Sequence, residues 1–156
     1  MKAPTDFATS IQAFFCEHLL QQKGVSPRTG NAYRDTFRLW LEYLCCVVRK
    51  PAEKVQLSDL CADNVTGFLQ YLEKERHNSI RTRNVRLAAV RSFVHYVIAV
   101  RAPDRLPELQ RILTIPCRRF VRPLIGFLSR EEMEAILQAP DQSWTGCRDR
   151  LLLTLL

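Results

Sequence analysis

The sequence contains no apolar run that approaches the roughly 20 residues needed for a membrane-spanning helix. Its N-terminus reads Met-Lys-Ala-Pro-Thr-Asp, and the hydrophobic core of a secretory signal peptide does not follow it. The sequence therefore lacks the usual signs of a membrane protein and of a secreted protein. We therefore expect a cytoplasmic protein that has no membrane partner.

Metal-ligand spacing is also missing, although the chain has six cysteines. They are Cys16, Cys45, Cys46, Cys61, Cys117 and Cys147. None of them forms a Cys-x-x-Cys pair, and no histidine has the spacing of a zinc ligand. Because Cys16, Cys45 and Cys46 fall in apolar helical patterns, we expect reduced thiols packed as small hydrophobic side chains.

Acidic residues are nearly absent from the central segment 76–122. This segment holds eleven arginines, no lysine, and only Asp104 and Glu108 as acids, a formal charge of +9. The remaining residues hold 12 basic and 14 acidic groups, a formal charge of −2. Arginine without lysine favours planar, bidentate contacts to phosphates or base edges. The segment therefore indicates a nucleic acid partner. An anionic membrane fits less well, since the arginines do not share one face opposite Trp and Phe.

What the chain does contain is helical periodicity. At 156 residues and 47% hydrophobic content, it is long enough to bury one substantial core. Apolar spacing predicts four main helices over residues 6–22, 27–49, 62–75 and 79–101, and a short helical turn over 108–113. Gly24 is expected to end the first helix, while Ser26 and Ser79 are expected N-caps. Four helices joined by short loops predict a compact helical bundle.

The pattern changes after Pro116. Residues 117–123 are basic and proline-bounded, which indicates a linker, and residues 124–127 predict a short strand. Ser129 and Glu132 form a capping box for a further helix, and the last segment, 145–156, is still apolar where it stops. We therefore expect a helical domain over 1–116, a linker over 117–123, and over 124–156 the opening of a larger domain that is cut short.

The fourth predicted helix concentrates positive charge at its start. Arg81, Arg83 and Arg86 crowd its first two turns, where like charges repel and cations oppose the helix macrodipole. A polyanion would relieve that repulsion. Because Arg83 and Arg86 lie three residues apart, we expect both to project from an exposed charged face. The alternative is a solvated basic face without a ligand.

Four stretches of the chain carry a family resemblance. They are Ser-Pro-Arg-Thr at 26–29 with Tyr33, then Ser79 and Thr82 with residues 86–93, then residues 127–133, and finally residues 148–153. In this order they cover nearly the whole chain and resemble the tyrosine recombinase (phage integrase) family, especially its Xer-like branch. The resemblance implies an all-α, four-helix SAM-like core-binding bundle, followed by the truncated start of an α+β catalytic domain. In that family the two domains clamp double-stranded DNA from opposite sides, and full-length members assemble as tetramers on paired sites.

The resemblance also implies which residues contact DNA, because the second and fourth helices of the family's N-terminal domain face the duplex. Carried over, the contacts are Ser26, Arg28, Thr29 and Arg34 on the second helix, Arg81, Thr82, Arg83 and Arg86 on the fourth, and Arg118, Arg119 and Arg122 along the linker. Tyr33 and Arg91 would be structural instead. The alternative for each arginine is a side chain that faces solvent.

The family's catalytic groups are a tyrosine nucleophile, two arginines, usually a histidine, and a lysine, which stabilise the charge of the phosphoryl transition state. The resemblance places all of them beyond Leu156, and no His-x-x-Arg occurs in the chain. Arg148 and Arg150 would precede the first catalytic arginine. We therefore expect a chain that binds DNA but does not cut it, with no cofactor, metal or small-molecule substrate.

Three hypotheses about function follow. The first is the DNA-binding portion of a site-specific recombinase or integrase that acts in DNA integration and recombination. The second is a stand-alone, non-catalytic module that occupies recombination sites, and a Thr-Gly-x-Arg motif soon after Leu156 would favour the first over it. The third is an all-α protein-interaction module with a fortuitous basic face, which persistent DNA binding at low salt would exclude.

Overall fold

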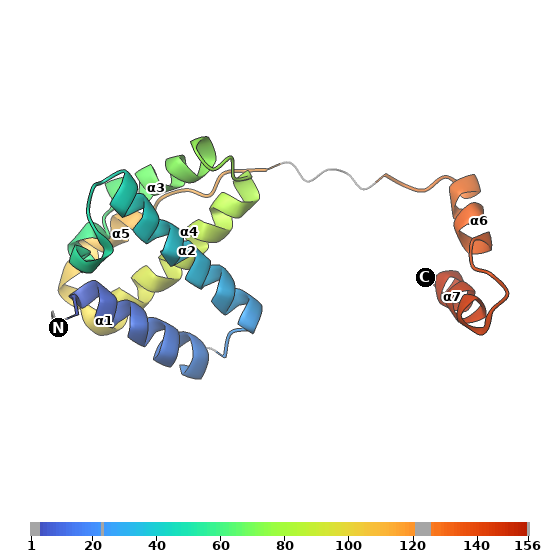
Figure 1. The fold of residues 1–156 in the computed structure, drawn as a ribbon, viewed down its shortest axis with the longest axis horizontal. Coiled ribbons are helices and arrows are strands. Elements are labelled where there is room, and N and C mark those ends of the chain that lie inside the picture. The colour runs from blue at the N-terminus through green and yellow to red at the C-terminus, as the bar shows by residue number, and fades with distance from the viewer. Residues whose placement is uncertain (1–3, 23, 121–125, 156) are drawn as a thin grey trace. The chain divides into compact units, whose positions relative to one another are not determined.

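The structure is a computed structural model that describes residues 4–22, 24–120 and 126–155. Throughout these ranges the regular structure is helical, and no β-strand occurs in them (Figure 1). The all-α fold class expected from the sequence is therefore confirmed. The chain divides into two compact units, Met1–Phe120 and Val121–Leu156.

The first unit contains the helices predicted from periodicity. The α-helices are α1 (Asp6–Ala13), α2 (Pro27–Cys46), α3 (Ala62–Lys74), α4 (Ile80–Tyr96) and α5 (Leu106–Leu113). Two π-helical segments extend them: η1 (Phe14–Gln22) continues α1, and η4 (Val97–Arg101) continues α4. Short 3-10 turns complete the unit: η2 (Ala52–Lys54), η3 (Leu57–Asp59) and η5 (Pro103–Arg105). Among the predicted ends, that of the second helix differs most, since α2 stops at Cys46 rather than near residue 49.

Local chemistry sets the ends of these helices. The Ser26 hydroxyl accepts the first-turn amide of Thr29 at 3.2 Å, and Pro27 follows at the first helical position. Ser79 caps α4 in the same way. Gly24 adopts a φ of +54°, which glycine reaches without the steric cost that a Cβ imposes. The predicted caps and the predicted glycine break are therefore confirmed.

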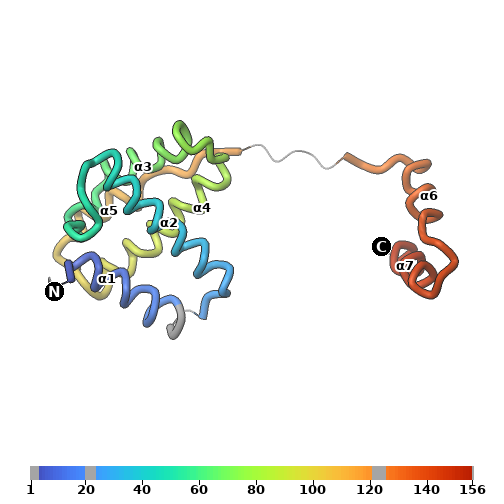
Figure 2. The backbone as a smooth tube through the Cα atoms, in the orientation of Figure 1, coloured from blue at the N-terminus to red at the C-terminus, as the bar shows by residue number. Residues whose placement is uncertain are grey.

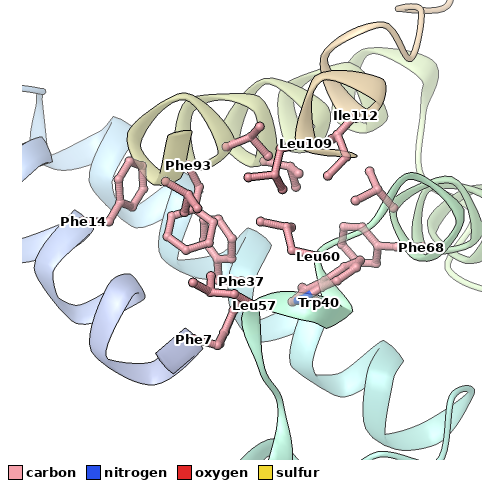
Figure 3. Packing of buried hydrophobic residues seen from close by; sticks show 14 of the residues in the cluster. Phe7, Phe14, Phe37, Trp40, Leu57, Leu60, Phe68, Phe93, Leu109 and Ile112 are labelled. Atoms are coloured by element: carbon pink, nitrogen blue, oxygen red, sulfur yellow. The ribbon is translucent and has the colours of Figure 1, made fainter. Parts of the chain in front are cut away.

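An aromatic core joins α1, α2 and α4 (Figure 3). The ring of Phe93 packs edge-on against Phe37 at 5.1 Å and against Phe14 at 5.2 Å. Trp40 packs edge-on against Phe68 of α3 at 5.3 Å, and α5 adds buried leucine and isoleucine side chains. Burying a large apolar side chain stabilises a fold by roughly 1.5–3 kcal/mol. This core therefore determines how α2 crosses α4 (Figure 2).

The predicted packing of the thiols is wrong. Cys16, Cys45 and Cys46 are all exposed rather than packed in the core. The buried stripe of α2 includes Trp40 and Leu44, and the next two residues of the helix point away from it. An apolar pattern at the end of a helix therefore did not imply burial.

The second unit contains α6 (Arg130–Gln138) and α7 (Trp144–Thr154). The predicted capping box is confirmed, since Ser129 and Glu132 each bond the other's backbone amide. Of the predicted strand over 124–127, residues 124 and 125 lie outside the described ranges, and Gly126 and Phe127 are not in a strand. Among the described residues of this unit only Gly146 is buried.

None of the helices in the described ranges combines the length and the apolar character that crossing a bilayer requires.

Candidate nucleic-acid interface

The N-terminal ends of α2 and α4 are built from one repeated sequence. Residues 26–31 and 79–84 both read Ser-x-Arg-Thr-x-Asn. In each copy the serine hydroxyl accepts the threonine amide at 3.2 Å, and the two hydroxyl oxygens lie 2.9 or 3.0 Å apart. Free amides at a helix start favour anions such as phosphate. The chain therefore contains two similarly capped helix ends whose dipoles favour anions, each with an arginine in its first turn, although Pro27 leaves α2 with one free amide fewer than α4.

Both helix ends lie on one side of the bundle. Figure 1 shows α2 and α4 crossing, with both N-terminal ends on the same flank of the first unit, α2 beginning low and α4 beginning high on that flank. The two helices contact each other along the crossing. A ligand the size of a duplex could therefore contact both ends at once.

Several arginines near these ends have guanidinium groups without a partner among the described residues. Those that are exposed, and that have neither an ion pair nor a side-chain hydrogen bond within the described residues, are Arg28, Arg34, Arg38, Arg81 and Arg119. Sequence reasoning named four of the five. It missed Arg38, although Arg38 lies one helical turn after Arg34, on the same face of α2.

The expectation that Arg83 lies on an exposed charged face is wrong. Only 8% of the surface of Arg83 is exposed to solvent. Arg83 Nε lies 2.9 Å from Oε1 of Glu73, although its N–H does not point at that oxygen, so the contact is a charge pair without a hydrogen bond. The same guanidinium donates to the Pro116 carbonyl at 3.3 Å and to Asn84 at 3.2 Å. The Arg83 guanidinium is therefore engaged by groups of the protein itself.

Glu73 on α3 also anchors the start of the predicted linker. Its second carboxylate oxygen lies 2.9 Å from Nη1 of Arg118. The Asn84 side chain bonds the backbone of Arg118 twice, donating to its carbonyl at 2.7 Å and accepting its amide at 3.1 Å. We call Glu73, Arg83, Asn84 and Arg118 the strap cluster. It fastens residues 116–118 to α3 and α4.

Arg86 connects the two crossing helices. Its guanidinium donates to the Ala32 carbonyl at 2.7 Å and to the Thr36 hydroxyl at 3.1 Å. Thr36 is fully buried and donates in turn to the same Ala32 carbonyl. Arg86 is half-buried, so the expectation of a fully exposed side chain is wrong here as well. Its contacts hold α4 against α2.

A shallow groove of about 240 Å³ runs between α2 and α4. Its lining residues are Ala32, Asp35, Arg81, Thr82, Val85 and Arg86. Three of them, Ala32, Asp35 and Val85, were not expected from the sequence as site residues. No local signal identified them, since their position depends on where the two helices cross.

The remaining expectations concern Tyr33, Arg91 and Arg122. Tyr33 stacks nearly parallel on Phe14 at 6.4 Å, and Arg91 donates to the Ile115 carbonyl, so both are structural as predicted. Arg122 lies outside the described residues. Within the described ranges, no three His, Cys, Asp or Glu side chains gather into a group that could hold a metal ion.

Comparisons with known proteins agree with this arrangement. The family model of the phage integrase N-terminal SAM-like domain matches residues 12–101. The chain is 40% identical over 154 residues to the putative integrase/recombinase y4rC of Sinorhizobium fredii, which covers 98% of this chain and 46% of that protein. It is 36% identical over 150 residues to y4rD of the same organism, covering 96% of this chain and 53% of that protein.

A third relative is the tyrosine recombinase XerD of Pseudomonas putida, which is 27% identical over 143 residues, covering 91% of this chain and 44% of that protein. The chain therefore spans about half the length of the curated relatives it matches. No solved structure gave a significant match.

Proposed function

This chain belongs to the phage integrase family of tyrosine recombinases, and from that premise we propose that its first unit binds duplex DNA as the DNA-binding portion of a site-specific recombinase. The observation that carries the proposal is the pair of similarly capped helix ends on one side of the bundle. Each end offers the positive end of a helix dipole and an exposed arginine to an anion. Phosphates of the duplex backbone are the anions that this arrangement fits.

The proposal divides the arginines into two groups. The side chains expected to contact DNA lie at the two helix ends and beside them: Ser26, Arg28, Thr29, Arg34, Arg38, Arg81, Thr82 and Arg119. In contrast, Arg83, Arg86 and Arg118 already have protein partners. They act by holding α2, α4 and the linker start in place, so that the contacting group meets the duplex in a fixed geometry.

We also propose that this chain does not cleave DNA by itself. Its four tyrosines are Tyr33, Tyr43, Tyr71 and Tyr96, and all four lie on helices of the first unit. Each of them packs against another aromatic ring there. We assign none of them as a nucleophile, and we expect the chain to leave supercoiled plasmid DNA intact while still binding it.

The test is a salt titration of binding to a fluorescent duplex. Each neutralised phosphate contributes a slope of about −0.9 in log K against log salt, so four to eight contacts predict roughly −4 to −7. Changing both Arg28 and Arg81 to alanine should make that slope less negative by about 2, since two phosphate contacts are lost. Because neither guanidinium pairs with another residue in the described ranges, the double variant should melt like the parent protein.

Arg130→Ala is the matched control. Arg130 is exposed on α6, pairs with Glu134 at 3.0 Å, and belongs to the other unit. Its removal should leave the slope unchanged. A parent slope near zero would contradict the proposed function.

A further inference from the structure

Asp35 is an acid on a surface whose other charged groups are cationic. It lies on α2 and lines the groove together with Arg81 and Arg86. Asp35 is exposed, and it forms no ion pair or side-chain hydrogen bond with any other described residue. Arg86 does not neutralise it, since that guanidinium bonds Ala32 and Thr36 instead. A carboxylate repels phosphate, so Asp35 cannot serve as a backbone contact.

Val85 is equally unsuited to a phosphate contact. It lies on α4 in the same groove, and 45% of its surface is exposed although cations flank it. A phosphate offers nothing to an apolar side chain. Among the groups that duplex DNA presents, the thymine methyl in the major groove is the one that an apolar side chain matches.

The position of the groove agrees with these chemical preferences. It lies between the two helices whose N-terminal ends we assign to the phosphate backbone. The major groove is about 12 Å wide and admits a helix, and each base pair presents a distinct pattern of groups there. Side chains between two backbone contacts on inserted helices meet base edges rather than phosphates.

We infer that Asp35 and Val85 set the base preference of the surface that α2 and α4 present to the duplex. Asp35 accepts a hydrogen bond from the N4 amino group of a cytosine, and Val85 packs against the methyl group of a thymine. The inference rests on the proposed function and adds to it the residues that set sequence preference. The arginines at the helix ends supply affinity, whereas this acid and this valine supply selectivity.

The experiment uses the whole chain and a library of duplexes with a randomised centre, selected at one fixed salt concentration. The parent protein should select a cytosine at one position. Replacing that cytosine should weaken binding roughly tenfold, the scale of one base-edge contact. Asp35→Asn should shift the preference at that position toward adenine, because an amide can bond adenine N6 and N7 together. Asp35→Ala should bind all four bases there within about twofold.

Val85 is tested with a base that lacks only the methyl group. Replacing the selected thymine with deoxyuridine should weaken binding by the parent protein several-fold, on the scale of a buried methyl group. Val85→Ala should bind the two duplexes equally. Glu53→Gln is the matched charge control for Asp35, since Glu53 is exposed on η2 and does not line the groove. That variant should leave every base preference unchanged.

The outcomes separate the two claims. If the parent protein does not bind duplex DNA at low salt, the proposed function itself fails. If the parent binds but selects no base, or if Asp35→Asn keeps the parent's preference, the inference about the groove is overturned while the proposed function stands. If Glu53→Gln changes the base preference as Asp35→Asn does, net charge rather than base contact explains the effect, and the inference is likewise overturned.

Discussion

Removing the carboxylate of Glu73 should destabilise the first unit, because the strap cluster depends on it. Glu73→Ala leaves the Arg83 guanidinium without its counter-charge, and the side chain of Arg83 is only 9% exposed. The same change also frees Arg118, whose side chain is 58% exposed. The two losses differ in size because water compensates an exposed charge far better than a buried one.

The expected magnitude follows from these contacts. Removing one partner of a buried ion pair costs about 3–5 kcal/mol. Arg83 keeps its bonds to Pro116 and Asn84, and its N–H was not aligned on the carboxylate, so the loss falls toward the lower end. Exposed pairs such as Glu73 with Arg118 contribute only about 0–1 kcal/mol. We therefore expect the free energy of unfolding to fall by about 3–4 kcal/mol.

Urea unfolding followed by circular dichroism measures this loss. The matched control is Glu42→Ala, which breaks the pair between Glu42 and Arg76, with side chains 44% and 39% exposed. That control should cost no more than about 0.5 kcal/mol. Changing both Glu73 and Arg83 to methionine should recover much of the loss, because no buried charge remains unpaired. The reasoning is refuted if Glu73→Ala shifts the urea midpoint no more than Glu42→Ala does.

Three further predictions concern stability and its link to binding. Arg86→Ala should lower the free energy of unfolding by about 1–3 kcal/mol in urea titrations, since hydrogen bonds between α2 and α4 are lost. The same variant should also weaken DNA binding, although the Arg86 side chain itself does not contact DNA, because the two helices are no longer held together. Burial raises the pKa of the Tyr43 hydroxyl above its ordinary value of 10.0, with a smaller contribution from Cys61, so stability should fall as pH rises above that value. Melts between about pH 9 and 11 should show this fall, and Tyr43→Phe should abolish it. A fragment ending at Phe120 should melt cooperatively and at a higher temperature than one ending at Leu113, because the shorter fragment lacks the contacts that Pro116 and Arg118 make with the strap cluster. Equal melting temperatures would show that the strap cluster adds no stability.

The helices and their caps could be predicted because they depend on neighbours in the chain. Ser26 and Ser79 cap their helices through amides three residues away, and Gly24 takes a positive φ that its own lack of a side chain permits. Apolar spacing likewise predicted the four main helices of the first unit. The repeated Ser-x-Arg-Thr-x-Asn was also present in the sequence and would have drawn attention to Asn84.

The role of each arginine could not be predicted in this way. Arg81 and Arg83 are two residues apart on one helix, yet Arg81 is exposed and has no partner among the described residues, while Arg83 is buried. The difference comes from Glu73 on another helix and from the Pro116 carbonyl, 33 residues along the chain. Hydropathy treats both arginines alike, because it carries no information about which distant groups will lie beside them.

The sequence by itself therefore determined which segments form helices, the basic character of the central segment and the family, since all three depend on residue type and local spacing. Only the tertiary structure decided which cations are free for a ligand, which ones hold the bundle together, and that Asp35 and Val85 share a groove. The physical reason is that a guanidinium becomes structural only when a carboxylate or carbonyl lies within about 3 Å of it. That proximity is created by the crossing of α2 over α4 and by the return of the chain after α5.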